Sequence, residues 1–154
     1  MIGASIRART GGDVDRCARL LLSLDPAERY PAAWPGDVRA WLAPEGMVAA
    51  WVAEDGGEVV AHVALRAVSD RRDAVLTRLW VAPGARRRGV ARALCDVACA
   101  RASELSLCPA LEVGRERLGA IAMYERSGWI RVSSEPRPMA DADGALAYDY
   151  RFRA

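Results

Sequence analysis

The residues best suited to chemistry lie in one turn, between a strand-like segment and a helical pattern. That turn consists of Arg86, Arg87, Arg88, Gly89, Val90, Ala91 and Arg92. The first turn of a helix presents free backbone N–H groups and the positive end of the helix dipole, which together bind anions. Gly89 lets the backbone approach a ligand closely, and successive N–H groups form a nest for phosphate oxygens. The turn therefore predicts a phosphate site; the alternative is a solvated arginine-rich loop.

Composition limits the possible partners. The chain has 154 residues, a length typical of one domain, so we expect a single domain over residues 1–154. Its formal net charge of +2 is too small to favour nucleic acid or a membrane surface as the main partner. The chain contains no lysine, so its basic residues are all arginine. The argument for a phosphate site therefore rests on the spacing in the turn and not on the number of arginines.

Cysteine usage indicates a reduced protein without a metal. The four cysteines, Cys17, Cys95, Cys99 and Cys108, form no CxxC pair. Cys95 and Cys99 are four residues apart in a helical pattern, but a zinc site needs two further ligands and His62 is the only histidine. We expect thiols packed in the core of a cytoplasmic protein, and no metal. No apolar segment reaches the roughly 20 residues that a membrane span requires.

Hydrophobic periodicity predicts an α/β fold, a mixed sheet with helices packed against it. Strand patterns occur at residues 5–9, 47–53, 58–67, 74–81, 110–113, 129–132 and 145–152. Helical patterns occur at residues 13–24, 37–42, 89–105 and 119–127. We expect Asp13 to cap the first helix and Gly128 to end the last one in the left-handed conformation. His62 falls in an alternating strand pattern and is expected to be structural; the alternative is a group that titrates in the reaction.

Two motifs resemble the GNAT superfamily of acyl-CoA N-acyltransferases. The pattern Arg86-x-x-Gly89-x-Ala91 resembles the pyrophosphate-binding motif of that superfamily, and the preceding residues 79–83 resemble its fourth strand and exit turn. Residues 111–113 and 120–129 resemble the fifth strand and the helix that follows it. The resemblance spans residues 76–132, with some local similarity to ribosomal-protein alanine N-acetyltransferases. It implies a GNAT fold: a mostly antiparallel sheet of six or seven strands, splayed between the fourth and fifth, with about four flanking helices.

The resemblance also implies how acetyl-CoA is bound. The backbone of Leu79, Trp80 and Val81 is expected to pair with the pantetheine arm as an added strand would. Backbone N–H groups of residues 87–92 are expected to hold the pyrophosphate. Many members have an asparagine seven residues before the catalytic tyrosine; this chain has Arg117 there, which can contact the same groups or a phosphate.

By the same resemblance, Tyr124 is the catalytic acid, and its hydroxyl protonates the departing thiolate. The alternative is a core tyrosine with a satisfied hydroxyl. The attacking amine must lose a proton, so a base is also expected. Histone-type members have a glutamate where this chain has Val75, whereas ribosomal-protein alanine N-acetyltransferases have one at the position of Glu112. Glu112 is therefore the candidate base; the alternative is a charged residue at the end of a strand.

The expected reaction is transfer of acetyl from acetyl-CoA to a primary amine by direct attack, through a tetrahedral intermediate. The acceptor is left open between a protein N-terminus and a small-molecule amine, including an antibiotic. Tyr30 and Trp34, in the proline-rich loop 25–36, are expected to bind it, or else to anchor the loop. The alternative to an enzyme is a non-catalytic acyl-CoA sensor. Homodimer formation is left open.

Overall fold

The computed structural model describes residues 3–24, 36–68, 72–139 and 145–152. These residues form one mixed sheet of eight strands in the order β1-β2-β3-β4-β5-β8-β6, with β7 paired to β8. The strands are β1 (Ser5–Ala8), β2 (Met47–Asp55), β3 (Glu58–Ala67), β4 (Asp73–Val81), β5 (Cys108–Gly114), β6 (Trp129–Arg131), β7 (Arg137–Pro138) and β8 (Leu146–Phe152). All described pairings are antiparallel except that of β4 with β5.

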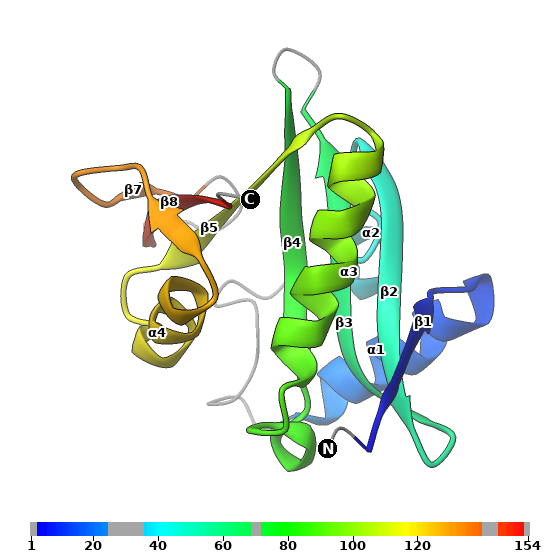
Figure 1. Ribbon diagram of the computed structural model, residues 1–154. Helices are drawn as coiled ribbons and strands as arrows, with labels where there is room; N and C mark the ends of the chain where they lie inside the picture. The colour runs from blue at the N-terminus through cyan, green and yellow to red at the C-terminus, as the bar shows by residue number, and fades with distance from the viewer. Residues whose placement is uncertain (1–2, 25–35, 69–71, 140–144, 153–154) are drawn as a thin grey trace.

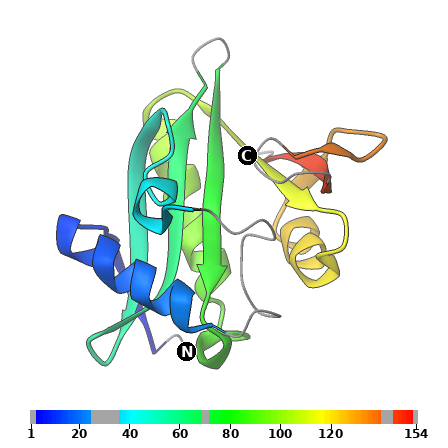
Figure 2. The same ribbon diagram turned by 180° about the vertical axis from the view of Figure 1, so that it is seen from behind.

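Helices cover both faces of the sheet. The four described α-helices are α1 (Gly11–Ser23), α2 (Val38–Trp41), α3 (Val90–Glu104) and α4 (Leu118–Arg126). Helix α3 lies along β2 to β5 on the face seen in Figure 1, and its buried residues share one core with Tyr124 of α4. Helices α1 and α2 lie on the opposite face, seen in Figure 2, and α1 packs against a second core. The sheet therefore separates two apolar layers.

The predicted architecture is confirmed, with three corrections. The sheet has eight strands instead of six or seven, because β7 contains two residues and gives no periodic signal. A 3-10 turn, Pro83–Ala85, precedes the arginine-rich turn and was also not predicted. The N-cap of α1 is Thr10; Asp13 lies in the first turn, where its carboxylate accepts a hydrogen bond from the Thr10 backbone N–H at 2.7 Å. Gly128 has the expected positive φ, 94°.

The sheet is splayed between β4 and β5. These strands pair at only three positions, the last of them Val75 with Ala110, although β4 continues to Val81 and β5 to Gly114. In Figure 1 the two strands diverge below this point. The predicted splay is therefore present, and the later part of β4 is paired with β3 alone.

A bulge in β4 reverses which side chains face each layer. His62 pairs with Trp80 and Ala64 with Thr77, so two residues of β4, Arg78 and Leu79, lie opposite one residue of β3. Arg78 has φ 56°, a left-handed conformation that few non-glycine residues adopt. As a result Leu79 packs against the α3 core, whereas Trp80 belongs to the α1 core. Without the bulge, Trp80 would share the face of Leu76.

His62 fixes the bulge. Its fully buried ring contacts the Arg78 carbonyl oxygen through Nδ1 at 2.9 Å and Nη1 of Arg9 through Nε2 at 3.0 Å. A guanidinium only donates and a carbonyl only accepts, so Nδ1 carries the proton and the ring is neutral. The ring also stacks on Trp80, at a centroid distance of 5.6 Å. These contacts give His62 the structural role expected from the sequence.

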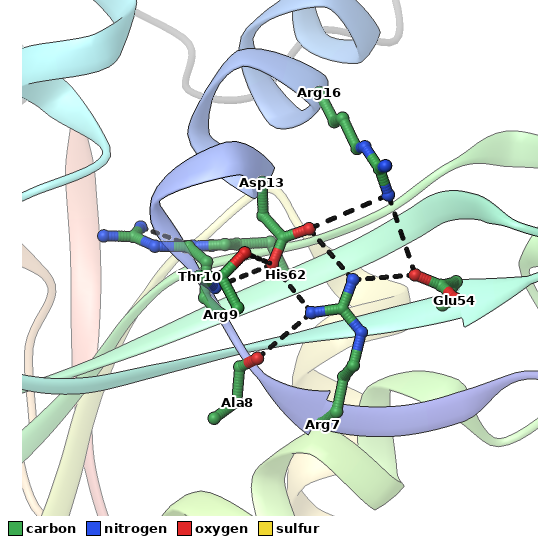
Figure 3. A network of polar contacts seen from close by, with 8 residues as sticks. All are labelled: Arg7, Ala8, Arg9, Thr10, Asp13, Arg16, Glu54 and His62. Carbon is green, nitrogen blue, oxygen red and sulfur yellow. Dashed lines mark hydrogen bonds and ion pairs between the residues drawn. The ribbon is translucent and has the colours of Figure 1, made fainter.

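An ion-pair network holds β1 and α1 next to this histidine (Figure 3). Arg7 donates two hydrogen bonds to the Asp13 carboxylate, at 2.7 and 2.9 Å, and one to Glu54 of β2 at 2.7 Å. The Arg7 guanidinium holds the pKa of Asp13 well below its usual range. Arg9, which directly follows β1, donates to the Leu42 carbonyl oxygen at 2.6 Å as well as to His62. The edge strand β1 is thereby joined to α1, to β2 and to the end of α2.

The buried neutral histidine predicts a pH-dependent stability. Burial lowers the pKa of His62 from 6.5 to about 4. In the unfolded chain the ring binds a proton as pH falls below 6.5, whereas in the folded protein it stays neutral until about pH 4. Stability contributed by the neutral ring is therefore complete above pH 6.5 and is lost as pH falls toward 4. Between pH 6.5 and 5 we expect a loss of about 2 kcal/mol in the free energy of unfolding, from 1.36 kcal/mol per unit.

Urea unfolding at pH 7.5, 6.5, 5.5 and 5.0 measures this loss. The chain has one histidine, so no other imidazole contributes. The matched variant His62→Gln is expected to be less stable at every pH, and to lack most of the pH dependence between 6.5 and 5. An equal pH dependence in wild type and His62→Gln would contradict the assignment.

Candidate active site

A pocket of about 360 Å³ lies where β4 leads into α3. Its walls come from the end of β4, from the arginine-rich turn and from α4. The turn and the start of α3 contribute Ala85, Arg86, Arg87, Gly89, Val90, Ala91 and Arg92. Most of the turn that the sequence identified as a phosphate site therefore surrounds one cavity.

The backbone of the turn has the conformation that an anion site requires. Gly89 is the N-cap of α3 and has φ 78°, and Arg87 also has a positive φ, 65°. The first intrahelical hydrogen bond at this end runs from the Ala93 N–H to the Gly89 carbonyl. The N–H groups of residues 90–92 precede that bond, so they have no acceptor within the helix. They form the positive end of the α3 dipole at the pocket.

The arginine side chains of the turn have different roles. Arg86 donates from Nε to the Val81 carbonyl oxygen at 3.1 Å, which ties the turn to the end of β4. Arg88 points elsewhere, because its Nη1 lies 3.6 Å from the Asp55 carboxylate in the β2–β3 hairpin and its side chain is not part of the pocket wall. Of the predicted cofactor residues, Arg88 is thus the one in the turn that does not line the cavity.

One wall of the pocket was missed by the sequence analysis. Helix α4 contributes Met123, Arg126 and Ser127, which are spaced i, i+3 and i+4 and therefore share one face of the helix. The spacing was visible in the sequence, but nothing local indicated that this face meets the start of α3. Arg126 adds a cation to the pocket, opposite the turn.

Tyr124 lies on the inner side of α4. It is 7% exposed, and its ring contacts Trp129 edge-on at 5.9 Å and lies 6.5 Å from the Tyr150 ring. The neighbouring Tyr150 hydroxyl donates to Glu125 at 2.8 Å, and burial raises the pKa of Tyr150 to about 12. The Tyr124 ring is thus held by aromatic packing in the core beneath α4, next to the helix face that lines the pocket.

Glu112 lies on the face of β5 that points away from the core containing Tyr124. Leu111 and Val113 are buried in the core that contains Tyr124, so the alternation of the strand directs Glu112 to the other side. Its carboxylate lies 3.2 Å from Nη2 of Arg137, and Arg137 also forms two hydrogen bonds with Asp149, the cross-strand partner of Glu112. Both carboxylates raise the pKa of Arg137.

The remaining predicted residues are placed as follows. Leu79, Trp80 and Val81 form the end of β4, beyond its pairing with β5. Arg117 is the N-cap of α4, and its backbone N–H donates to Gly114 at 3.0 Å; its side chain does not line the pocket. Tyr30 and Trp34 lie outside the described residues.

No metal site is found in the part of the chain that the structure describes: no three His, Cys, Asp or Glu side chains gather there. Cys95 and Cys99 are free, and burial raises the pKa of each thiol to about 12, which disfavours the thiolate needed for ligation. Among the described helices, none is both long and apolar enough to cross a membrane.

The fold and the pocket agree with a family match. The model of the acetyltransferase (GNAT) family matches residues 16–129 of the 154. The chain belongs to the GNAT family of acetyltransferases. It is therefore an acyltransferase, and family membership implies that it uses acetyl-CoA. No curated protein matches the chain by sequence.

Solved GNAT structures have the same fold at low identity. The ribosomal-protein-S18-alanine N-acetyltransferase from Escherichia coli is 19% identical, with a TM-score of 0.73 over 97% of this chain and 92% of that one. Ard1 from Thermoplasma volcanium is 21% identical, with a TM-score of 0.75 over 99% and 100%. A spermidine N-acetyltransferase chimera, partly from Vibrio cholerae, is 19% identical, with a TM-score of 0.72 over 97% and 95%.

The pocket fits the diphosphate part of acetyl-CoA. The N–H groups of residues 90–92, which have no acceptor within the helix, match phosphate oxygens, and arginines line the cavity from both the turn and α4. These residues would hold the phosphates, while acetyl-CoA would supply an activated thioester.

Two arginines allow a matched test of this fit. Arg126 lines the pocket, whereas Arg88 pairs with Asp55 and does not. We expect Arg126→Ala to weaken acetyl-CoA binding about tenfold, the effect of losing one charge-assisted contact to phosphate. Arg88→Ala removes the same charge from the chain and should change affinity less than threefold. Titration calorimetry with acetyl-CoA at fixed ionic strength gives both affinities. Equal losses in the two variants would mean that only the total charge matters.

Proposed function

We propose that the chain, as one acetyltransferase domain, transfers acetyl from acetyl-CoA to a primary amine by direct attack. The observation that supports this most strongly is the position of the phosphate pocket, at the end of β4 where β4 and β5 have diverged. A thioester whose phosphates lie at the start of α3 can extend along the free side of β4. The backbone of residues 79–81 would pair with its pantetheine arm, and Arg117 would act at the entrance to α4.

The reaction needs two proton transfers on different sides of the thioester carbon. The amine nitrogen attacks that carbon, a tetrahedral intermediate forms, and the carbon–sulfur bond then breaks to give the amide and a thiolate. Strand N–H groups of β4 would polarise the carbonyl. Tyr124, on the α4 side of the sheet, would donate its hydroxyl proton to the thiolate.

Glu112 would take a proton from the acceptor ammonium, directly or through water, to give the neutral amine that attacks. It lies on the face of β5 opposite the core that contains Tyr124. The amine would therefore lose its proton on one side of the sheet, and the thiolate would gain one on the other. Arg137 and Asp149 would keep its carboxylate in one orientation.

The acceptor would bind on the face that carries α1, α2 and Glu112. We propose that Tyr30 and Trp34 line its site, since they belong to the segment between those two helices. Two of the similar structures above are named for very different acceptors, a ribosomal-protein alanine and spermidine. The acceptor of this chain would accordingly be either a protein N-terminus or a small amine.

Tyr124→Phe tests the acid. The substitution removes one hydroxyl and keeps the ring that packs against Trp129. We expect kcat to fall on the order of 100-fold, the low end for a general acid, with acetyl-CoA affinity within a factor of two of wild type. Thiol release in the presence of a panel of amines measures the rate, and calorimetry measures the affinity. Full activity in Tyr124→Phe would mean that water protonates the thiolate unaided, and loss of affinity would indicate a structural role.

Glu112→Gln tests the base. The amide keeps the shape of the side chain and removes its basicity. We expect kcat/KM to fall at neutral pH and to recover as pH rises, because a larger share of the acceptor is then already neutral. The measurement is kcat/KM against pH for wild type and variant with one amine. Parallel profiles of equal height would show that Glu112 serves only to bind Arg137.

A further inference from the structure

The indole nitrogen of Trp80 is a buried donor without an acceptor. Trp80 is 5% exposed, and its Nε1 finds no hydrogen-bond partner among the described residues. A buried N–H that gives up water without gaining an acceptor destabilises the fold by about 1 to 3 kcal/mol. Such groups are rare in native structures and mark strain, catalysis or an absent ligand.

The polar groups around Trp80 are satisfied by one another. His62, stacked on the indole, uses one ring nitrogen on the Arg78 carbonyl and the other on Arg9. Arg78 donates from Nε to the Trp41 carbonyl oxygen at 2.8 Å. These contacts fix the Trp80 ring between a histidine and the α1 core, yet none of them accepts from its N–H. The indole N–H is therefore held in one orientation, and its hydrogen-bonding capacity is unused.

The bulge places this donor on the acceptor side of the sheet. Trp80 is packed with residues of α1, whereas the phosphate pocket opens between α3 and α4 on the other face. Trp80 also lies five residues beyond Val75, the last residue of β4 that pairs with β5, and so within the divergent part of the sheet. Its nitrogen is covered in this structure, so a ligand reaches it only by displacing the residues that cover it.

We propose that the Trp80 indole N–H donates a hydrogen bond to an oxygen of the amine acceptor. This assignment rests on the proposed function and narrows its substrate class: the preferred acceptor is an amine that carries a carbonyl or hydroxyl oxygen near the amino group. A site built to donate to a substrate oxygen discriminates strongly against an analogue that lacks it, because the donor is then left unpaired. The other available oxygen, the thioester carbonyl, would lie along the end of β4 and is the competing source.

Two amines of similar shape, one with an oxygen and one without, distinguish the acceptor oxygen from the thioester carbonyl as the partner of the indole N–H. L-alaninamide carries a carbonyl next to the amine-bearing carbon, and 3-methylbutan-2-amine replaces the carboxamide with an isopropyl group. The first readout is the indole ¹⁵N–¹H resonance of Trp80, identified among the five tryptophans as the one absent from Trp80→Phe. With coenzyme A bound, to prevent turnover, we expect alaninamide to move this resonance downfield and 3-methylbutan-2-amine to leave it in place.

The second readout is selectivity. We expect the ratio of kcat/KM for alaninamide to kcat/KM for 3-methylbutan-2-amine to fall about tenfold in Trp80→Phe, the effect of one hydrogen bond to substrate. In a ratio, any change in acetyl-CoA binding cancels. Trp51→Phe, which alters a half-buried tryptophan of β2, is the control and should leave the ratio unchanged.

Three results would overturn the proposed role of Trp80. A Trp80 resonance that moves fully with acetyl-CoA alone assigns the donor to the thioester and overturns the proposal, as does a resonance that neither amine moves. An unchanged selectivity ratio in Trp80→Phe overturns it as well. Thiol release by the wild type tests the proposed function separately: turnover of both amines with an unmoved resonance leaves the acetyltransferase reaction standing and rejects this role for Trp80.

Discussion

The site depends on one feature of the sheet, the end of pairing between β4 and β5 after Val75 and Ala110. The other neighbouring strands in the order β1-β2-β3-β4-β5-β8-β6 are paired antiparallel. Because β5 diverges from β4, the end of β4 pairs with β3 along one edge only. Its other edge faces the gap between β4 and β5. The pocket at the start of α3 lies at the end of this gap, so a ligand whose phosphates bound there would extend into the gap.

The bulge at Arg78 gives the two sides of the gap different chemistry. It directs Leu79 toward the α3 core and Trp80 toward the α1 core, and β5 likewise presents Leu111 and Val113 on one face and Glu112 on the other. The left-handed Arg78 is held by three kinds of contact: the His62 hydrogen bond to its carbonyl, its own bond to the Trp41 carbonyl, and its guanidinium 4.6 Å from the Trp41 ring. A neutral, deeply buried histidine thus supports the geometry of β4.

The sequence predicted what local patterns can determine. The long strands and helices and the glycine cap at Gly128 follow from periodicity and backbone freedom, and they were located to within about two residues. The positive φ of Gly89 likewise follows from the freedom of glycine. Features that depend on distant partners were not predicted. Arg126 lines the pocket because the end of α4 and the start of α3 form walls of the same cavity. Arg88 instead pairs with Asp55 of the β2–β3 hairpin, and Glu112 pairs with Arg137 of β7, a strand joined to β5 through β8. The bulge was also hidden, since a positive φ at an arginine has no signature in sequence.

The most direct test of the account is hydrogen exchange along β4 with and without acetyl-CoA, followed residue by residue by NMR. If the divergent end of β4 binds the pantetheine arm as an added strand would, saturating acetyl-CoA should slow exchange of backbone amides within residues 79–81. Those of Ala74 and Val75, which are already paired with both β3 and β5, should stay unchanged. Exchange that is equally fast in residues 79–81 with and without acetyl-CoA would contradict the central claim that the gap between β4 and β5 is the cofactor site.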